Sequence, residues 1–143
     1  MVRIANETVH DGRSVAAIVR WALREMEVDT YVRSIRVAHH TGEHSWQGRW
    51  FEGRRHAVIR IGKTFPAKTN VYKRKRDKMP VGPVLADWRE ALVWGLGHEL
   101  KHARQHRSGR PRREVETEWA AYRLLQAWLV KHGKEGHVRS SGS

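Results

Sequence analysis

The sequence contains no cysteine, no long apolar run and far fewer acidic than basic residues. Without cysteine, disulfide bonds and thiolate metal sites are excluded, so any metal ion must be held by His, Asp or Glu side chains. No apolar segment approaches the roughly 20 residues that a membrane-spanning helix needs, and residues 1–13 contain no apolar core of a signal peptide. We therefore expect a cytoplasmic protein without a membrane partner.

The composition that is present suits one folded domain with a basic surface. The 143 residues can form a single hydrophobic core, and 39% hydrophobic and 30% charged residues are typical of a globular chain. We expect residues 1–132 to form this domain, as a monomer, and the Gly- and Ser-rich residues 133–143 to be a disordered tail. The net charge of +13 favours an anionic partner, of a kind that charge alone does not specify.

Hydrophobic periodicity predicts an α+β fold with the order helix, strands, helix, helix. The strands should form a small mixed or antiparallel sheet of about three strands and bury alternate residues. The inward residues of the two clearest strands are Ile35 and Val37, and Ala57, Ile59 and Ile61. The expected elements are a helix over 11–28, a strand over 31–39, a loop or hairpin over 40–56, a strand over 56–62, and helices over 87–106 and 111–132.

The expected helices carry recognisable end signals. Asp11 or Ser14 can cap the first helix, and Asp87 with Glu90 has the spacing of a capping box. Pro111, after the helix-breaking "RSGRP", can occupy the first turn of the last helix. In the long basic connection between the last strand and the second helix, we expect one short strand, near residues 70–72.

The second helix contains the pattern HExxH, as His98, Glu99 and His102. Because positions four apart share a helix face, the two histidines can present their imidazoles to one metal ion. Glu99 lies beside them, where it can act as general base on a water molecule that the metal activates. The motif is short and also occurs by chance, in which case these are ordinary polar residues on a charged helix.

The neighbouring residues favour the metal interpretation. Leu92, Leu96 and Leu100 predict a mostly buried helix, in which His and Glu need partners. Gly95 and Gly97 each cost roughly 1 kcal/mol of helix propensity relative to Ala. Such glycines are easier to understand if a strand or a substrate approaches the helix closely; otherwise they mark a local kink.

A catalytic zinc ion needs a third protein ligand, and the last helix offers Glu118. This residue lies on the apolar stripe of that helix, so its carboxylate should point toward the core, where it needs a metal or an ion pair. Glu114, one turn earlier on the same side, is the next choice, and His106 and His132 are further alternatives. A salt bridge to an arginine is the interpretation of Glu118 without a metal.

"HELKH" followed by "ETEWAAYRLL" resembles the minimal zincin metallopeptidases with Glu as third ligand, the gluzincin type. The small intracellular enzymes of the ImmA/IrrE type combine HExxH with a later Glu that has Ala three residues after it, as Glu118 and Ala121 do here. The layout also resembles, less closely, the SprT-like domain, which works on DNA-bound proteins. The resemblance covers residues 57–129 and implies a zincin-like fold and a zinc metalloendopeptidase.

The resemblance implies two further parts of the site. In zincins, the sheet edge beside the active-site helix often binds substrate as an added strand, and residues 56–62 are the expected edge. A side chain that stabilises the oxyanion is also implied. The candidates for this role are Tyr72, His56, His39 and Tyr122.

Two basic segments flank the predicted catalytic helix, with seven Lys and Arg in residues 63–78 and six in residues 101–113. They predict a phosphate-binding surface for nucleic acid, for which Trp46 and Trp50 are candidate stacking residues. Alternatively, they form a solvated loop and a helix end, where cations suit the helix dipole.

The sequence therefore predicts a zinc-dependent metallopeptidase in which His98, His102 and Glu118 bind Zn²⁺ and Glu99 is the general base. We expect a protein or peptide substrate, with DNA-associated proteins as one class. The main alternative is a basic nucleic-acid-binding module with a structural or vestigial HExxH. A third possibility is a zinc-free helical interaction protein.

Overall fold

The computed structural model describes residues 1–69 and 83–133 of the chain. It confirms an α+β fold, with three helices, a four-stranded mixed sheet and a two-stranded antiparallel sheet. The elements are β1 (Arg3–Asn6), α1 (Gly12–Glu25), β2 (Ser34–His39), β3 (Trp46–Phe51), β4 (His56–Ile61), β5 (Ala67–Lys68), β6 (Val84–Leu85), α2 (Trp88–Arg107) and α3 (Glu114–Lys131).

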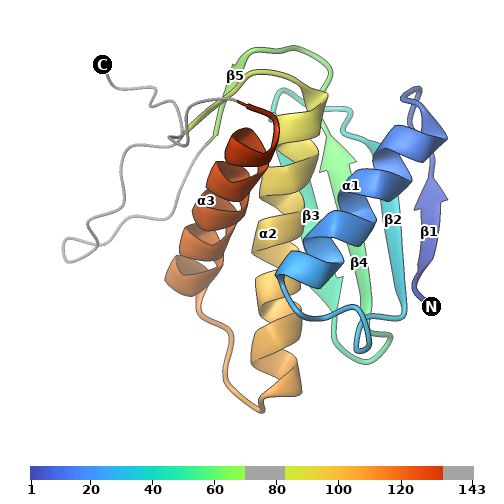
Figure 1. The fold of residues 1–143 in the computed structure, drawn as a ribbon, viewed down its shortest axis with the longest axis vertical. Helices are drawn as coiled ribbons and strands as arrows, with labels where there is room; N and C mark the ends of the chain where they lie inside the picture. Colours follow the sequence, from blue (N-terminus) through green and yellow to red (C-terminus); the bar gives the residue numbers. More distant parts are fainter. Residues whose placement is uncertain (70–82, 134–143) are drawn as a thin grey trace.

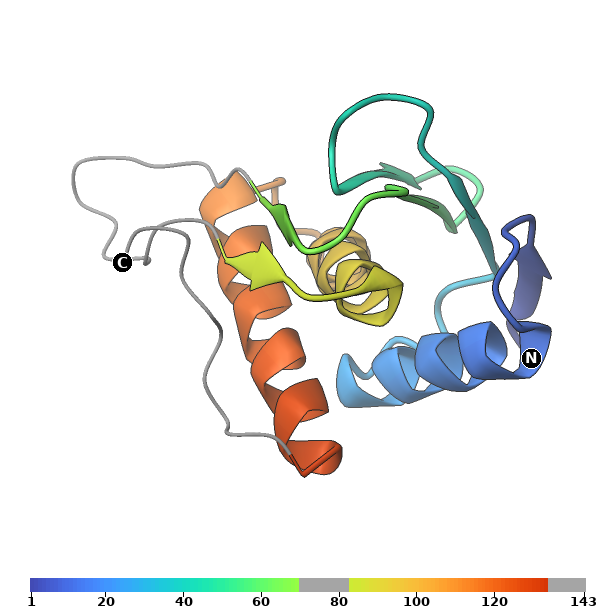
Figure 2. The same cartoon turned by 90° about the horizontal axis from the view of Figure 1, so that it is seen from above.

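The four-stranded sheet has the order β1-β2-β4-β3. Strand β2 is parallel to both β1 and β4, whereas β3 runs antiparallel to β4. Helices α1 and α2 cover one face of the sheet, and α3 packs against α2 (Figures 1 and 2). Among the described helices, none has the length and apolar character to cross a membrane.

The core lies between the sheet and α1 and α2. The five strand residues predicted to face inward are all buried, with exposed fractions of 0 or 1%. Helix α2 is buried on almost every side because it contacts α1, the sheet and α3. The site residues of α2 therefore lie among packed side chains rather than on a solvated surface.

Side-chain caps start two of the helices at the predicted residues. The Asp11 carboxylate accepts the Ser14 N–H of α1 at 2.9 Å, and the Asp87 carboxylate accepts the Glu90 N–H of α2 at 3.0 Å. These bonds satisfy N–H groups that lack partners in a first helical turn. The Glu90 carboxylate accepts from the Ala86 N–H, one residue before the cap, at 3.1 Å.

Several predicted boundaries were wrong. Helix α1 ends at Glu25, before the positive φ of 57° at Glu27 turns the chain. Pro111 lies outside α3, because the Gln105 carboxamide bonds both backbone groups of Arg113 and keeps this segment out of the helix.

Strand β1 was not predicted, and β3 lies within the segment left open as a loop or hairpin. The short strand expected near 70–72 lies outside the described residues. So does the expected tail, apart from Gly133.

Gly95 and Gly97 allow α2 to approach both of its neighbours. A Cβ atom at Gly97 would lie 2.6 Å from the Ala121 Cα of α3, and one at Gly95 would lie 2.7 Å from the Ile59 Cγ2 of β4. Real Cβ contacts are essentially never this short. The glycines therefore serve close packing against a helix and a strand, as one of the two interpretations from sequence expected.

We predict that Gly97→Ala destabilises the protein. The added methyl meets backbone of α3 that cannot rotate away, and such overpacking costs about 1–3 kcal/mol, only partly offset by the better helix propensity of Ala. The control is Gly12→Ala in the first turn of α1, where a Cβ meets nothing within 4 Å. Urea unfolding should show a lower midpoint for Gly97→Ala alone; equal midpoints for both variants would contradict the packing argument.

Candidate metal centre and cleft

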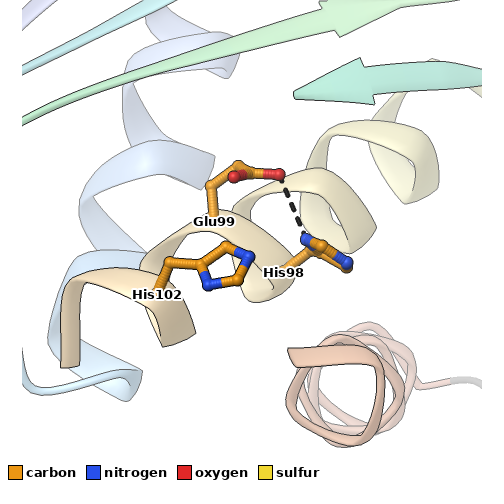
Figure 3. Close-up of side chains that lie close together, drawn as sticks. All are labelled: His98, Glu99 and His102. Carbon is orange, nitrogen blue, oxygen red and sulfur yellow. Dashed lines mark hydrogen bonds and ion pairs between the residues drawn. The ribbon is translucent and has the colours of Figure 1, made fainter. Parts of the chain in front are cut away.

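His98, Glu99 and His102 form a group that could hold a metal ion. One nitrogen or oxygen atom from each of the three residues lies within 4.8 Å of the others. Figure 3 shows Glu99 directed toward the strands, while both imidazoles leave the same side of α2. The imidazole ring centroids are 5.4 Å apart, and His98 Nδ1 lies 3.1 Å from Glu99 Oε2. The predicted helix face is therefore present.

A carboxylate from α3 meets both histidines. Glu114 Oε2 lies 3.3 Å from His98 Nε2, and Glu114 Oε1 lies 3.2 Å from His102 Nε2. Zinc in proteins accepts imidazole nitrogens and carboxylate oxygens as ligands. These side chains therefore offer a suitable set of donor atoms, with each histidine in contact with a different oxygen of Glu114.

The other candidate ligands occupy different positions. Glu118 is buried on α3, one turn beyond Glu114. His106 contacts the Tyr31 hydroxyl at 2.5 Å, and His132 contacts the Trp128 carbonyl at 2.9 Å. The structure thus brings Glu114 to the HExxH histidines, whereas His106 and His132 have partners elsewhere. The role of Glu118 as third ligand stays a prediction.

The site has the electrostatic character of a cation site. Burial opposes protonation of His98, but its contacts with Glu114 and Glu99 outweigh burial and raise its pKa to about 9. The bond to His98 lowers the pKa of Glu114 to about 2, whereas burial lowers the pKa of His102. The carboxylates thus stabilise positive charge where the imidazoles converge.

Two further side chains hold the candidate ligands, and sequence reasoning missed both. The buried Gln105 lies with Oε1 3.1 Å from His102 Nδ1, and its Nε2 donates to Glu116 at 2.9 Å. Thr117 donates to the Glu114 carbonyl at 2.7 Å and lies 3.1 Å from His98 Nε2. A partner on the ring nitrogen that does not bind the metal, as Gln105 is for His102, fixes the orientation of a metal-binding histidine. The spacing of Gln105, three residues after His102 on the same helix, could have indicated their contact from the sequence.

A cleft of about 340 Å³ opens beside His98 and Glu99. Its wall consists of residues 44–48, which end in β3, together with Lys68 of β5. A Cβ atom at Gly48 would lie 2.7 Å from Glu99 Oε2, so β3 passes directly over the Glu99 carboxylate. Gly48 was missed from sequence, although a glycine inside "WQGRW" is typical of a close approach to a strand.

The prediction that residues 56–62 form the sheet edge was wrong. Strand β4 lies between β2 and β3, so the edge beside α2 is β3. The reason is the β3–β4 hairpin, which places the earlier strand outside the later one.

The expected oxyanion-stabilising histidines lie outside the cleft. His56 Nδ1 lies 2.7 Å from the Ser34 hydroxyl, and His39 Nε2 accepts the Val9 N–H at 3.0 Å. Tyr72 lies outside the described residues, and Tyr122 packs against Trp119 of its own helix. The cleft itself contains two cationic or polar candidates that were not predicted, His44 and Lys68.

Comparison with known proteins does not classify the chain. No protein-family model matches it, and searches of curated proteins and of solved structures find no significant match. The resemblance to zincins therefore rests on the sequence motifs and stays a prediction.

We predict about one zinc ion per chain in the wild-type protein, measured by elemental mass spectrometry after dialysis. His98→Ala should lose the ion, and Glu114→Gln should weaken zinc binding at least about tenfold, because each removes a ligand. His132→Ala is the control and should keep full stoichiometry. Loss of zinc in Glu118→Gln but not in Glu114→Gln would move the third ligand to Glu118. No zinc in wild type, even after refolding with added metal, would contradict the site.

Proposed function

We propose that this protein is a zinc-dependent metallopeptidase. The observation that carries the proposal is the position of Glu99, whose carboxylate lies between the two histidines of its own helix and the edge strand β3. A potential general base, potential metal ligands and a strand that can pair with a peptide thus lie at one cleft. A zinc-dependent peptidase can use all three: the metal to activate water, the base to move its proton, and the strand to hold the peptide.

The donor set favours zinc among the common metals. His98, His102 and Glu114 together offer a His₂Glu set, which in catalytic zinc sites leaves one coordination position open. Zinc bound there would polarise a peptide carbonyl and lower the pKa of a water molecule. Glu114 is our choice for the third ligand because of its distances of 3.3 and 3.2 Å to the imidazoles.

The protein's own residues supply proton transfer and orientation. Glu99, only 3% exposed, is placed to take a proton from the attacking water and deliver it to the leaving amine. Gln105 holds the imidazole of His102 through its Nδ1 atom. His44 and Lys68 line the cleft and are candidates to stabilise negative charge on the carbonyl oxygen.

The substrate is proposed to bind as an extended peptide along β3. This strand pairs with β4 on one side only, so backbone groups on its other side are available to a further strand. Because Gly48 has no side chain, a peptide added here would approach Glu99 closely. Pairing with the edge strand would fix the backbone of the substrate peptide. The residues that line the cleft would then determine which substrate side chains are accepted.

We predict that Glu99→Gln abolishes peptide hydrolysis but keeps zinc and the fold. Loss of a general base lowers the rate by about 10²–10⁴-fold, while the amide preserves the size of the side chain. Turnover of a quenched fluorescent peptide library reports the activity, and Glu25→Gln, an exposed change on α1, is the control. Unchanged turnover in Glu99→Gln would rule out this mechanism.

We predict that Gly48→Ala lowers turnover on the order of 10–100-fold. The added methyl group would displace the Glu99 carboxylate, and a displacement of a catalytic group by about 1 Å has an effect of this size. Zinc content should be unchanged. Gly53→Ala, in the β3–β4 turn where a Cβ meets nothing within 4 Å, should keep full activity. Equal activity of the two variants would argue against β3 as the wall of the active cleft.

The second candidate function is a nucleic-acid-binding module whose HExxH is structural or vestigial. The net charge of +13 favours it. It predicts that neither Glu99→Gln nor Gly48→Ala changes any measurable function, so the same two variants separate the candidates.

A further inference from the structure

The face of the four-stranded sheet opposite α1 and α2 is rich in arginine. Figure 2 shows all three helices on the other side of this sheet. Within the described strands, no outward position is acidic. The outward residues, which we call the outer sheet face, are Arg3, Ala5, Ser34, Arg36, Ala38, Gln47, Arg49, Phe51, His56, Val58 and Arg60.

The arginines of the outer sheet face form a connected group. Across the strands, Arg36 is in register with Val58, and Val58 is in register with Arg49. Val58 is only 7% exposed although no helix covers it. The arginine stems on either side explain this burial, since long cationic side chains cover apolar surface while their charged groups stay in water.

Within residues 1–69 and 83–133, most of these charges have no acidic partner. Arg36 pairs with Glu7 at 2.9 Å, whereas Arg3, Arg49 and Arg60 form no ion pair with any described residue. Arg49 and Arg60 are diagonal neighbours on β3 and β4, since Arg49 is in register with Val58 and Gln47 with Arg60. Two adjacent guanidinium groups repel one another, and an anionic ligand would relieve this repulsion. The outer sheet face is therefore suited to a polyanion.

An aromatic ring lies among these cations. Phe51 is partly exposed, and the Arg49 guanidinium carbon lies 4.7 Å from its ring centroid. Beside it, residues of β3 and β4 that include Gln47, Val58 and Arg60 line a hollow of about 260 Å³. A ring beside guanidinium groups on an open sheet suits a flat base with its phosphate, because bases stack on aromatic and guanidinium planes.

We propose that the outer sheet face binds single-stranded nucleic acid, with phosphates on Arg49 and Arg60 and a base on Phe51. This site differs from the basic segments 63–78 and 101–113 predicted from sequence. It does not rest on the metallopeptidase proposal, because Arg49, Phe51 and Arg60 do not line the cleft beside Glu99.

The test is fluorescence anisotropy of a labelled 20-nucleotide single strand of mixed sequence, at several salt concentrations. The double variant Arg49→Gln/Arg60→Gln removes two phosphate contacts. The slope of log affinity against log salt should therefore become less steep by about 1.4, and the affinity at 0.1 M salt should drop on the order of tenfold. The control, Arg13→Gln/Arg20→Gln, removes the same charge from exposed positions on α1. Equal losses in both double variants would overturn the site.

Phe51→Leu tests the base contact separately from charge. It should weaken binding several-fold without changing the salt slope, because stacking carries no charge. Tighter binding of a duplex of the same length, or equal binding of a 20-residue polyglutamate, would overturn the proposal in favour of a duplex or an acidic protein. Glu99→Gln should bind the single strand like wild type. The binding test therefore gives an answer even if the peptidase proposal fails.

Discussion

Every part of the candidate site depends on how closely α2 approaches its two neighbours. Side chains are absent at Gly97, where α3 passes, and at Gly48, where β3 passes over Glu99. The first approach brings Glu114 to the histidines, and the second brings an edge strand to the potential base. Added Cβ atoms at the two glycines would lie 2.6 and 2.7 Å from their neighbours. A larger residue at Gly97 would push α3 away, and one at Gly48 would displace the Glu99 carboxylate.

Features set by local sequence could be predicted. The caps at Asp11 and Asp87 depend on a side chain and an N–H three residues away, and the inward strand residues follow from alternation. The shared side of His98 and His102 follows from helical geometry alone. The α+β class follows from the order of the elements, which the structure confirms.

Features set by tertiary packing could not be predicted. Nothing within residues 56–62 shows that β3 folds outside them, because strand order depends on pairing rather than on alternation. Glu114 and Glu118 lie one turn apart on the same side of α3, so helical periodicity hardly separates them. Their positions relative to α2 depend on where α3 begins, which the contact between Gln105 and Arg113 helps to set.

The central claim is that α2 and α3 together hold one zinc ion beside Glu99. The most direct measurement is a crystal structure of zinc-loaded protein with anomalous data at the zinc absorption edge. The account predicts one anomalous peak about 2.0–2.2 Å from His98 Nε2, His102 Nε2 and a Glu114 oxygen, with the Glu99 carboxylate beyond bonding distance. A peak elsewhere, or none at these residues in fully loaded crystals, would contradict it.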